Sequence, residues 1–164
     1  MSTTVTYGTL WHRYLGTFGE DLTEDQARAR HDAREMYAAM ISEDGRPVAA
    51  LDVVQRPPVV TVFFLDEERR DASTYVFSAH PDGDGLWLEQ TFVREIVDQR
   101  TIVAQEWVVT NPAGLLRTEA YTRDDPTRTV TESTFDPADH PELREPFPAF
   151  GEYASITRWE RTAG

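Results

Sequence analysis

The chain has 164 residues, a length that suits one folded domain with its own hydrophobic core. Its net charge of −13 excludes the concentrated positive charge that binding to nucleic acids or anionic membranes needs, so we expect neither partner. The sequence contains no Cys, which excludes disulfides, thiolate nucleophiles and Cys-ligated zinc. All 16 basic residues are Arg, so Schiff-base chemistry on Lys is excluded as well.

The N-terminal residues contain neither a basic segment nor an apolar segment, so the sequence predicts no secretory signal. The longest apolar run, residues 59–65, is much shorter than the roughly 20 residues that cross a bilayer. We therefore expect a cytoplasmic protein.

Three elements are predicted in the first third of the chain. Residues 5–15 alternate in polarity and predict a first strand, with a short helix as the alternative. Thr23 followed by Gln26 forms a capping box that predicts a helix from residue 24. This helix could extend to residue 41, but we prefer a strand over residues 35–42, because Asp44-Gly45 is a hairpin signal before the apolar residues 46–54.

A long meander of strands follows. Six segments that are rich in apolar and Thr residues are separated by turn sequences, and we expect strands at residues 59–65, 72–79, 86–96, 101–110, 115–123 and 127–135. Residues 136–150 contain four Pro and predict a loop, with a lid over a binding site as one interpretation. Residues 151–161 predict a final strand. Ten antiparallel strands are most simply closed into a barrel, so we expect a mainly β fold: a single β-barrel domain over residues 1–164 with one N-terminal helical segment.

The face of the strands that points into this barrel is predicted to mix aromatic with polar residues. It is assigned Leu86, Leu88, Gln90, Phe92, Val103, Gln105, Trp107, Val109, Leu116, Thr118, Ala120, Thr122, Thr129, Thr131, Ser133 and Phe135. Buried hydroxyl and amide groups need partners, so this pattern favours a cavity that holds water or a partly polar ligand. A filled core is the alternative, since Thr is also a good strand residue and an error of one position would invert every face.

The layout resembles the calycins, which include the lipocalins and the fatty-acid-binding proteins. Residues 8–11 resemble the N-terminal Gly-x-Trp of that group with one extra residue, and residues 157–160 resemble the Thr-Arg-x-Tyr of the last strand of fatty-acid-binding proteins. In that family the Arg and the Tyr hold a ligand carboxylate. Here Arg158 matches, whereas Glu160 stands in place of the Tyr. The resemblance implies a closed barrel with an internal ligand site.

The chain also resembles, more loosely, the small actinobacterial β-barrel cyclases of natural-product biosynthesis. The resemblance lies in its Lys-free composition, rich in Ala, Asp, Glu and Val, as is typical of GC-rich genomes. It implies that the protein folds a reactive polyene or polyketide and promotes its cyclisation.

Candidate site residues come from the expected inward positions and from the two ends of the chain. The catalytic candidates are His12, Tyr14 and Glu106, because each could act as an acid or base if it faces a cavity. The ligand-contacting candidates are Trp11, Tyr75, Phe77, Gln90, Phe92, Gln105, Trp107, Thr118, Thr131, Arg158 and Trp159. The other histidines, His31, His80 and His140, are expected on the surface, and no His spacing predicts a metal site. We expect no cofactor.

Two functions fit these expectations. The first is an enzyme without a cofactor, a cyclase or isomerase that holds a small hydrophobic metabolite and uses cavity shape with one or two polar groups. The second is a carrier or sensor of a small lipophilic molecule. A protein-interaction module that uses the acidic surface is a third alternative, and a homodimer is left open.

Overall fold

The computed structural model describes residues 1–98 and 101–161 and contains one α-helix and thirteen strands in this part of the chain. The elements, in chain order, are β1 (Thr3–Gly8), β2 (Trp11–His12), β3 (Thr17–Phe18), β4 (Asp21–Leu22), α1 (Glu24–Asp32), β5 (Tyr37–Glu43), β6 (Arg46–Gln55), β7 (Pro58–Leu65), β8 (Asp71–Ala79), β9 (Leu86–Ile96), β10 (Ile102–Thr110), β11 (Leu115–Thr122), β12 (Thr129–Thr134) and β13 (Arg144–Glu145), with 3-10 turns at Pro137–Asp139 and Pro141–Leu143.

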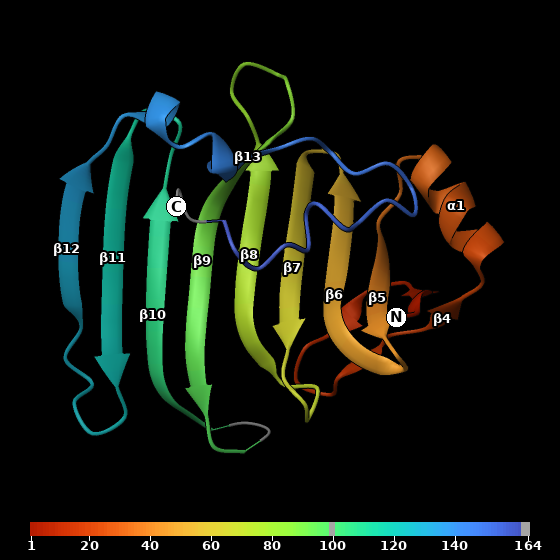
Figure 1. The fold of residues 1–164 in the computed structure, drawn as a ribbon, viewed down its shortest axis with the longest axis horizontal. Helices are drawn as coiled ribbons and strands as arrows, with labels where there is room; N and C mark the ends of the chain where they lie inside the picture. Colours follow the sequence, from red (N-terminus) through yellow and green to blue (C-terminus); the bar gives the residue numbers. More distant parts are fainter. Residues whose placement is uncertain (99–100, 162–164) are drawn as a thin grey trace.

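Eleven of the strands form one antiparallel sheet (Figure 1). Its order is β12-β11-β10-β9-β8-β7-β6-β5-β1-β4, and β13 pairs with the end of β9. In the described residues no pairing joins β12 to β4, so the expected closure into a barrel is not confirmed. The antiparallel meander from β5 to β12 is confirmed, because each strand pairs with the next one along the chain.

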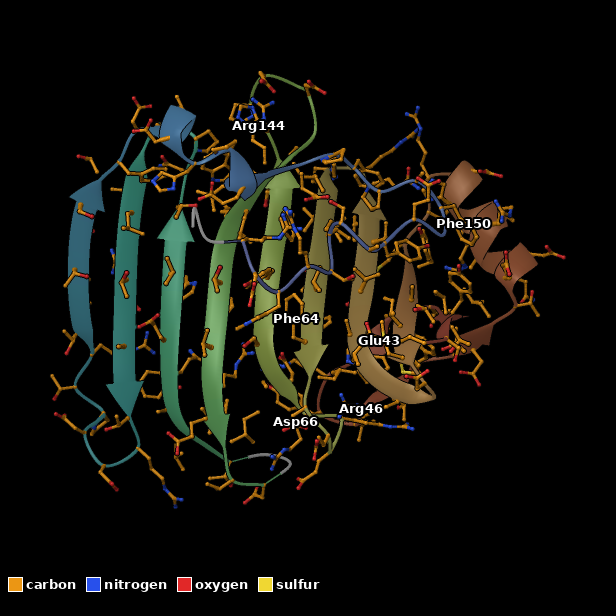
Figure 2. All side chains as sticks on the ribbon, viewed as in Figure 1. Glu43, Arg46, Phe64, Asp66, Arg144 and Phe150 are labelled. Atoms are coloured by element: carbon orange, nitrogen blue, oxygen red, sulfur yellow. The ribbon has the colours of Figure 1, made fainter. Side chains whose placement is uncertain are left out.

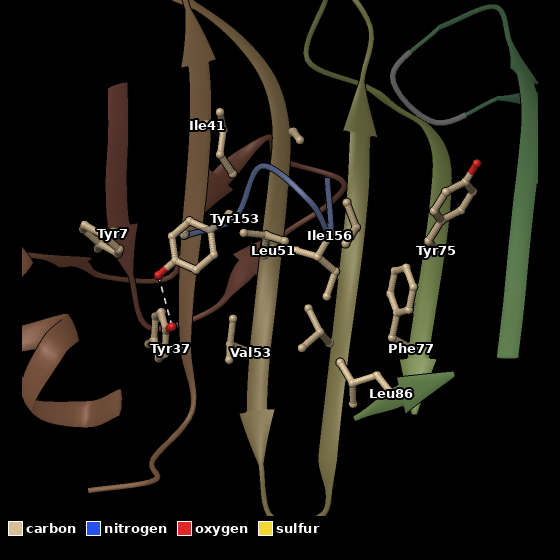
Figure 3. Packing of buried hydrophobic residues seen from close by; sticks show 14 of the residues in the cluster. Tyr7, Tyr37, Ile41, Leu51, Val53, Tyr75, Phe77, Leu86, Tyr153 and Ile156 are labelled. Atoms are coloured by element: carbon tan, nitrogen blue, oxygen red, sulfur yellow. Dashed lines mark hydrogen bonds between the residues drawn. The ribbon is translucent and has the colours of Figure 1, made fainter. Parts of the chain in front are cut away.

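The main core lies on the face of the sheet that is covered by residues 146–161, a segment that we call the strap. The strap passes in front of β6 to β9 in Figure 1. Its Tyr153 and Ile156 are buried against apolar side chains of β5 to β9, which include Tyr37, Leu51 and Phe77 (Figure 3). We call this side the strap face. Arg161 is buried near the end of the strap, where its Nη1 lies 2.7 Å from Oε2 of Glu145 in β13.

Hydrogen bonds between side chains join the strap to α1. The hydroxyl of Tyr37 lies 3.1 Å from that of Tyr153 and 3.0 Å from Nδ1 of His31 in the helix. Burial lowers the pKa of His31 and raises that of Tyr37 to about 12, so at neutral pH the imidazole accepts and the hydroxyl donates. The ring of Phe150 stacks on the ring of Tyr7, and the guanidinium of Arg28 in α1 lies over the Phe150 ring. Figure 2 shows Phe150 beside α1.

A second, smaller core lies on the opposite face, under the two-stranded sheet of β2 and β3. Trp11 is buried there against Ala38, Ala50 and Phe63. The backbone N–H of Trp11 donates to Oδ1 of Asp52, and burial raises the pKa of that carboxyl group to about 6. We call this side the hairpin face.

The local predictions for the first half of the chain are largely confirmed. The capping box is present, since Thr23 accepts from the backbone N–H of Gln26 and the Gln26 side chain accepts from that of Thr23. The preferred strand after the helix is β5, joined to β6 through Asp44-Gly45. The first strand is shorter than expected, because it ends at Gly8 and a separate β2 follows.

The predicted final strand over residues 151–161 is wrong. This segment forms turns instead, and its buried residues Tyr153 and Ile156 are three positions apart rather than two. Backbone hydrogen bonds within the segment, from Thr157 to Tyr153 and from Arg158 to Ser155, account for that spacing.

Candidate functional site

The strap leaves part of its own face uncovered. It passes over β6 to β9, whereas β10 to β12 are crossed only at one end, by residues 136–143 (Figure 1). Every residue of β12 is exposed, and those of β10 and β11 are mostly half-buried. The uncovered part of the strap face is therefore open to a ligand.

The floor of this area consists of small and hydroxyl-bearing side chains. Residues that lie opposite each other in paired strands share a face, so the registers define rows across β9 to β12. One row is Val93, Glu106, Ala120 and Thr129, the next is Thr91, Val108, Thr118 and Thr131, and a third contains Thr110, Leu116 and Ser133. From Leu116 to Thr122 the floor is about 20 Å long, at roughly 3.3 Å per residue.

Two hollows lie along this floor. The first has a volume of about 430 Å³ and includes Val93, Glu106, Ala120 and Thr129 in its lining. The second has a volume of about 330 Å³ and lies between the floor residues Thr110 and Leu116 and the segment that crosses them. Its lining is completed by Phe135, His140, Glu142, Leu143 and Arg161. They lie at opposite ends of the floor, separated by the central row of Thr91, Val108, Thr118 and Thr131, and the second end is mainly apolar. We call the floor together with its two hollows the trough.

That second end contains a pair of groups that can exchange protons. Nδ1 of His140 lies 2.8 Å from Oε1 of Glu142, and the ring of His140 packs edge-to-face on Phe135. When the carboxylate accepts from Nδ1–H, the ring is held in the tautomer with an unprotonated Nε2. The His140 side chain is 38% exposed, in line with the predicted surface position, and it also lines the second hollow. The sequence feature that could have indicated this pair is the placement of His140 and Glu142 on either side of Pro141.

Three of the predicted site residues belong to this trough. Glu106 lines the first hollow, as does Gln105 from the opposite face of β10, and Thr118 and Thr131 lie in adjacent positions of the central row, which lines neither hollow. Glu106 is exposed. Trp159 of the strap lies over Tyr75 at the border of the trough, with ring centroids 5.5 Å apart, and remains 47% exposed.

Four other predicted residues lie on the hairpin face, so the expectation that all inward candidates share one face is wrong. Gln90, Phe92, Gln105 and Trp107 form a cluster there: Phe92 stacks on Trp107 at 5.7 Å, and the Trp107 indole donates to Gln90. Gln105 accepts from Nε of Arg94. The polar groups of these side chains thus already have hydrogen-bond partners within the protein, and a role in ligand binding stays a prediction for them.

A β-bulge explains the error for Gln90 and Phe92 in β9, whereas in β10 the predicted faces were one position off, because Val108 rather than Trp107 pairs with Thr118. Val76 lies opposite Gln90 while the next residue, Phe77, lies opposite Leu88, so Glu89 is an extra residue in β9. The bulge puts Leu86 and Leu88 on the strap face with Thr91 and Val93, and it moves Gln90 and Phe92 to the other side. Strict alternation along residues 86–96 could not reveal this change.

The N-terminal candidates lie away from the trough. Trp11 is buried on the hairpin face, His12 is exposed beside it, and the exposed ring of Tyr14 contacts the guanidinium of Arg13 at 5.0 Å. Phe77 is fully buried under the strap, where the guanidinium of Arg161 covers its ring. Arg158 is exposed on the strap, where it lines a groove beside β1 and β5.

The hairpin face also contains a buried charged cluster. Oδ2 of Asp71 lies 3.0 Å from Nη1 of Arg94 and 3.2 Å from Nη2 of Arg13, and Thr74 donates to the same carboxylate. Burial raises the pKa of Asp71, whereas the two guanidinium groups oppose this effect. Because each member is bonded to another, the cluster ties the N-terminal segment to β8 and β9.

In the described part of the chain, no three His, Asp or Glu side chains converge in an arrangement that could hold a metal ion. None of the described helices is long and apolar enough to cross a bilayer. Comparison of the chain with family models, with curated proteins and with solved structures finds no match.

Proposed function

We propose that this protein binds a small, elongated and mainly apolar molecule along the trough on the strap face of β9 to β12. The observation that supports this most directly is the floor, which consists mostly of Thr, Ala and Val side chains together with Glu106, Leu116 and Ser133, beside two hollows of about 430 and 330 Å³. Such volumes suit a small ligand, and the Thr hydroxyls supply a few polar anchors on an otherwise apolar surface. The carrier or sensor function expected from the sequence needs only this binding.

The binding proposal is tested by filling the trough. An uncharged apolar dye, Nile red, should gain emission with the wild-type protein and lose that gain in Thr118→Trp and Thr131→Trp, because an indole would cover the central row. Thr134→Trp is the matched control: it lies on the same strand as Thr131 but on the hairpin face. If all three variants keep the emission, or if all lose it equally, the trough does not bind the dye.

An enzymatic function has a specific observation in its favour, namely the His140–Glu142 pair at the wall of the second hollow. We propose that Nε2 of His140 removes a proton from a carbon acid bound in the trough and returns it at another position, which amounts to isomerisation. In a polyene or polyketide of natural-product type, the same transfer can start a cyclisation. The atoms balance without a cofactor, because the proton leaves and re-enters the same molecule.

This second proposal is tested with 2-decanone in D2O, followed by NMR. The wild-type protein should accelerate exchange of the protons next to the carbonyl, and His140→Gln should abolish the acceleration. A Glu142→Gln variant should lower it, since the amide no longer stabilises the charged imidazolium. Equal exchange with and without protein would contradict the enzymatic proposal. If the dye still binds to the trough, the carrier or sensor function would then be the one supported.

The calycin relationship also remains a proposal. It is supported by the order of the elements: a first strand, one helix and then an uninterrupted antiparallel meander. A cytoplasmic location is a separate proposal.

A further inference from the structure

The strand β12 forms a long, unprotected end of the sheet. All six of its residues are exposed, and among the described residues it pairs only with β11. The edge at the opposite end of the sheet is shorter. Its last strand, β4, has two residues and covers only the end of β1, so residues 3–6 of β1 have no strand partner on the side away from β5. Proteins usually protect an edge strand with Pro, Lys, a bulge or a covering segment. β12 has none of these, and the charge of its one ionisable residue, Glu132, is balanced by Arg117 of β11.

The hydrogen bonds around β12 show which of its backbone groups point away from the sheet. The N–H of Phe135 donates to the carbonyl of Gly114, and that of Asn111 donates to Leu115. Because the bonding direction alternates along an antiparallel strand, Thr129, Thr131 and Ser133 bond to β11. The N–H and C=O groups of Val130 and Glu132 therefore point outward.

We propose that two copies of this chain form a symmetric homodimer in which β12 of one copy pairs antiparallel with β12 of the other. Val130 lies on the two-fold axis, opposite Val130 of the second copy. This register places the outward groups of Val130 in a hydrogen-bonded pair and brings Arg128 opposite Glu132 of the second copy. On the strap face it places Thr129 opposite Thr131 of the second copy, and such Thr pairs are favourable across strands.

Charge supports this register. On the hairpin face, Arg117 lies 3.3 Å from Glu132, and Arg128 lies 3.1 Å from Glu119. These four charges cancel, so two copies can approach at this edge although each has a net charge of −13. Arg128 and Glu132 are 61% and 59% exposed, which leaves both able to meet a partner across the axis. Opposite charges in facing positions stabilise a pair of strands.

The first test uses the absence of Cys in the sequence. In the proposed dimer the two Val130 Cα atoms are about 5.5 Å apart, as in any hydrogen-bonded antiparallel pair, and a disulfide can span that distance. Val130→Cys should form a covalent dimer under mild oxidation. Val93→Cys is the matched control, because Val93 is 40% exposed and Val130 is 45% exposed, but Val93 lies inside the sheet. Equal cross-linking of both variants would overturn the proposal.

The second test blocks the edge without affecting the monomer. Val130→Pro removes an N–H that β11 does not use, so the variant should fold and melt like the wild type at low concentration. In sedimentation velocity the wild-type protein should shift toward the dimer mass as concentration rises, while Val130→Pro stays at the monomer mass. A wild-type protein that stays monomeric overturns the proposal. So does association without a Val130 disulfide, which would indicate pairing of β12 with residues 3–6 of the next copy.

Discussion

Arg161 and Glu145 form the most deeply buried ion pair of the strap, with Nη1 and Oε2 2.7 Å apart and side-chain exposures of 2% and 3%. Arg161 also donates to the backbone carbonyl of Ser155, so one guanidinium joins β13 to the strap. Removing one partner leaves an uncompensated charge in the core. We expect Glu145→Gln and Arg161→Met each to lower the free energy of unfolding by about 3–5 kcal/mol.

Urea denaturation measures this effect, and two controls define its origin. The double variant Arg161→Met/Glu145→Leu should recover much of the loss, because no charge is left buried. Arg144→Ala breaks an exposed pair with Asp82 and should cost less than about 1 kcal/mol. If the double variant is no more stable than the single ones, packing rather than charge holds the strap.

Asp52 makes the stability depend on pH in a direction unusual for a carboxyl group. Burial raises its pKa from 3.8 to about 6, so the folded state holds its proton more tightly than the unfolded state does. Stability should therefore fall as the pH rises from about 4 to about 6, by at most about 3 kcal/mol at 1.4 kcal/mol per unit. Asp52→Asn should remove this slope, because its amide oxygen can still accept from the N–H of Trp11.

The measurement is the midpoint of urea unfolding at several pH values between 4 and 8, compared between Asp52→Asn and wild type. Other carboxyl groups contribute to both proteins equally, so only the difference reports Asp52. Asp25→Asn, on the exposed side of α1, serves as the control. A difference curve that is flat over this range would show that the Asp52 carboxylate is as well solvated folded as unfolded.

Local signals made the elements predictable, because each depends on a few neighbouring residues. The helix start needed only Thr23 and Gln26, and the β5–β6 hairpin needed only Asp44-Gly45. The candidate site was less predictable. Thr118 and Thr131 share the strap face as expected. In β10, however, Glu106 lies on that face in place of Gln105 and Trp107, and in β9 the extra residue Glu89 moves Gln90 and Phe92 to the other face.

The remaining features depend on contacts between distant parts of the chain. The strap is held by the pair Arg161–Glu145 and by the hydroxyl of Tyr153, whose partner Tyr37 is 116 positions away. Whether a sheet closes depends on how its twist brings the ends together, and no spacing in the sequence encodes that. His140 enters the trough because residues 136–143 cross over β10 and β11, which is also a tertiary effect.

Gly114, between β10 and β11, should tolerate no side chain. Its φ of +94° already disfavours a side chain, and a Cβ there would collide with the backbone oxygen of Phe135. Gly83 has a similar φ of +81°, but a Cβ there would meet nothing within 4 Å. Gly83→Ala should therefore cost only the backbone strain, about 1–3 kcal/mol, and Gly114→Ala should cost more.

Thermal unfolding followed by circular dichroism compares the two variants. Because the strain is common to both, the difference isolates the collision with Phe135, and we expect the midpoint for Gly114→Ala to be several degrees lower than that for Gly83→Ala. Equal midpoints would mean that the β11–β12 connection shifts at little cost. That connection would then be too compliant to hold the floor of the trough in place.

The hydroxyl groups of Tyr37 and Tyr153 should be energetically coupled, because each lies 3.1 Å from the other in the main core (Figure 3). Tyr37→Phe removes a partner of both Tyr153 and His31, so we expect it to cost about 1–3 kcal/mol. Tyr153→Phe should cost a similar amount. In the double variant the costs should not add, and the coupling energy from urea unfolding should be at least about 0.5 kcal/mol. Tyr14→Phe, at an exposed ring, should change stability little. Additive costs would mean that the two hydroxyls are satisfied independently, and α1 would then be held to the strap by the packing of Phe150 alone.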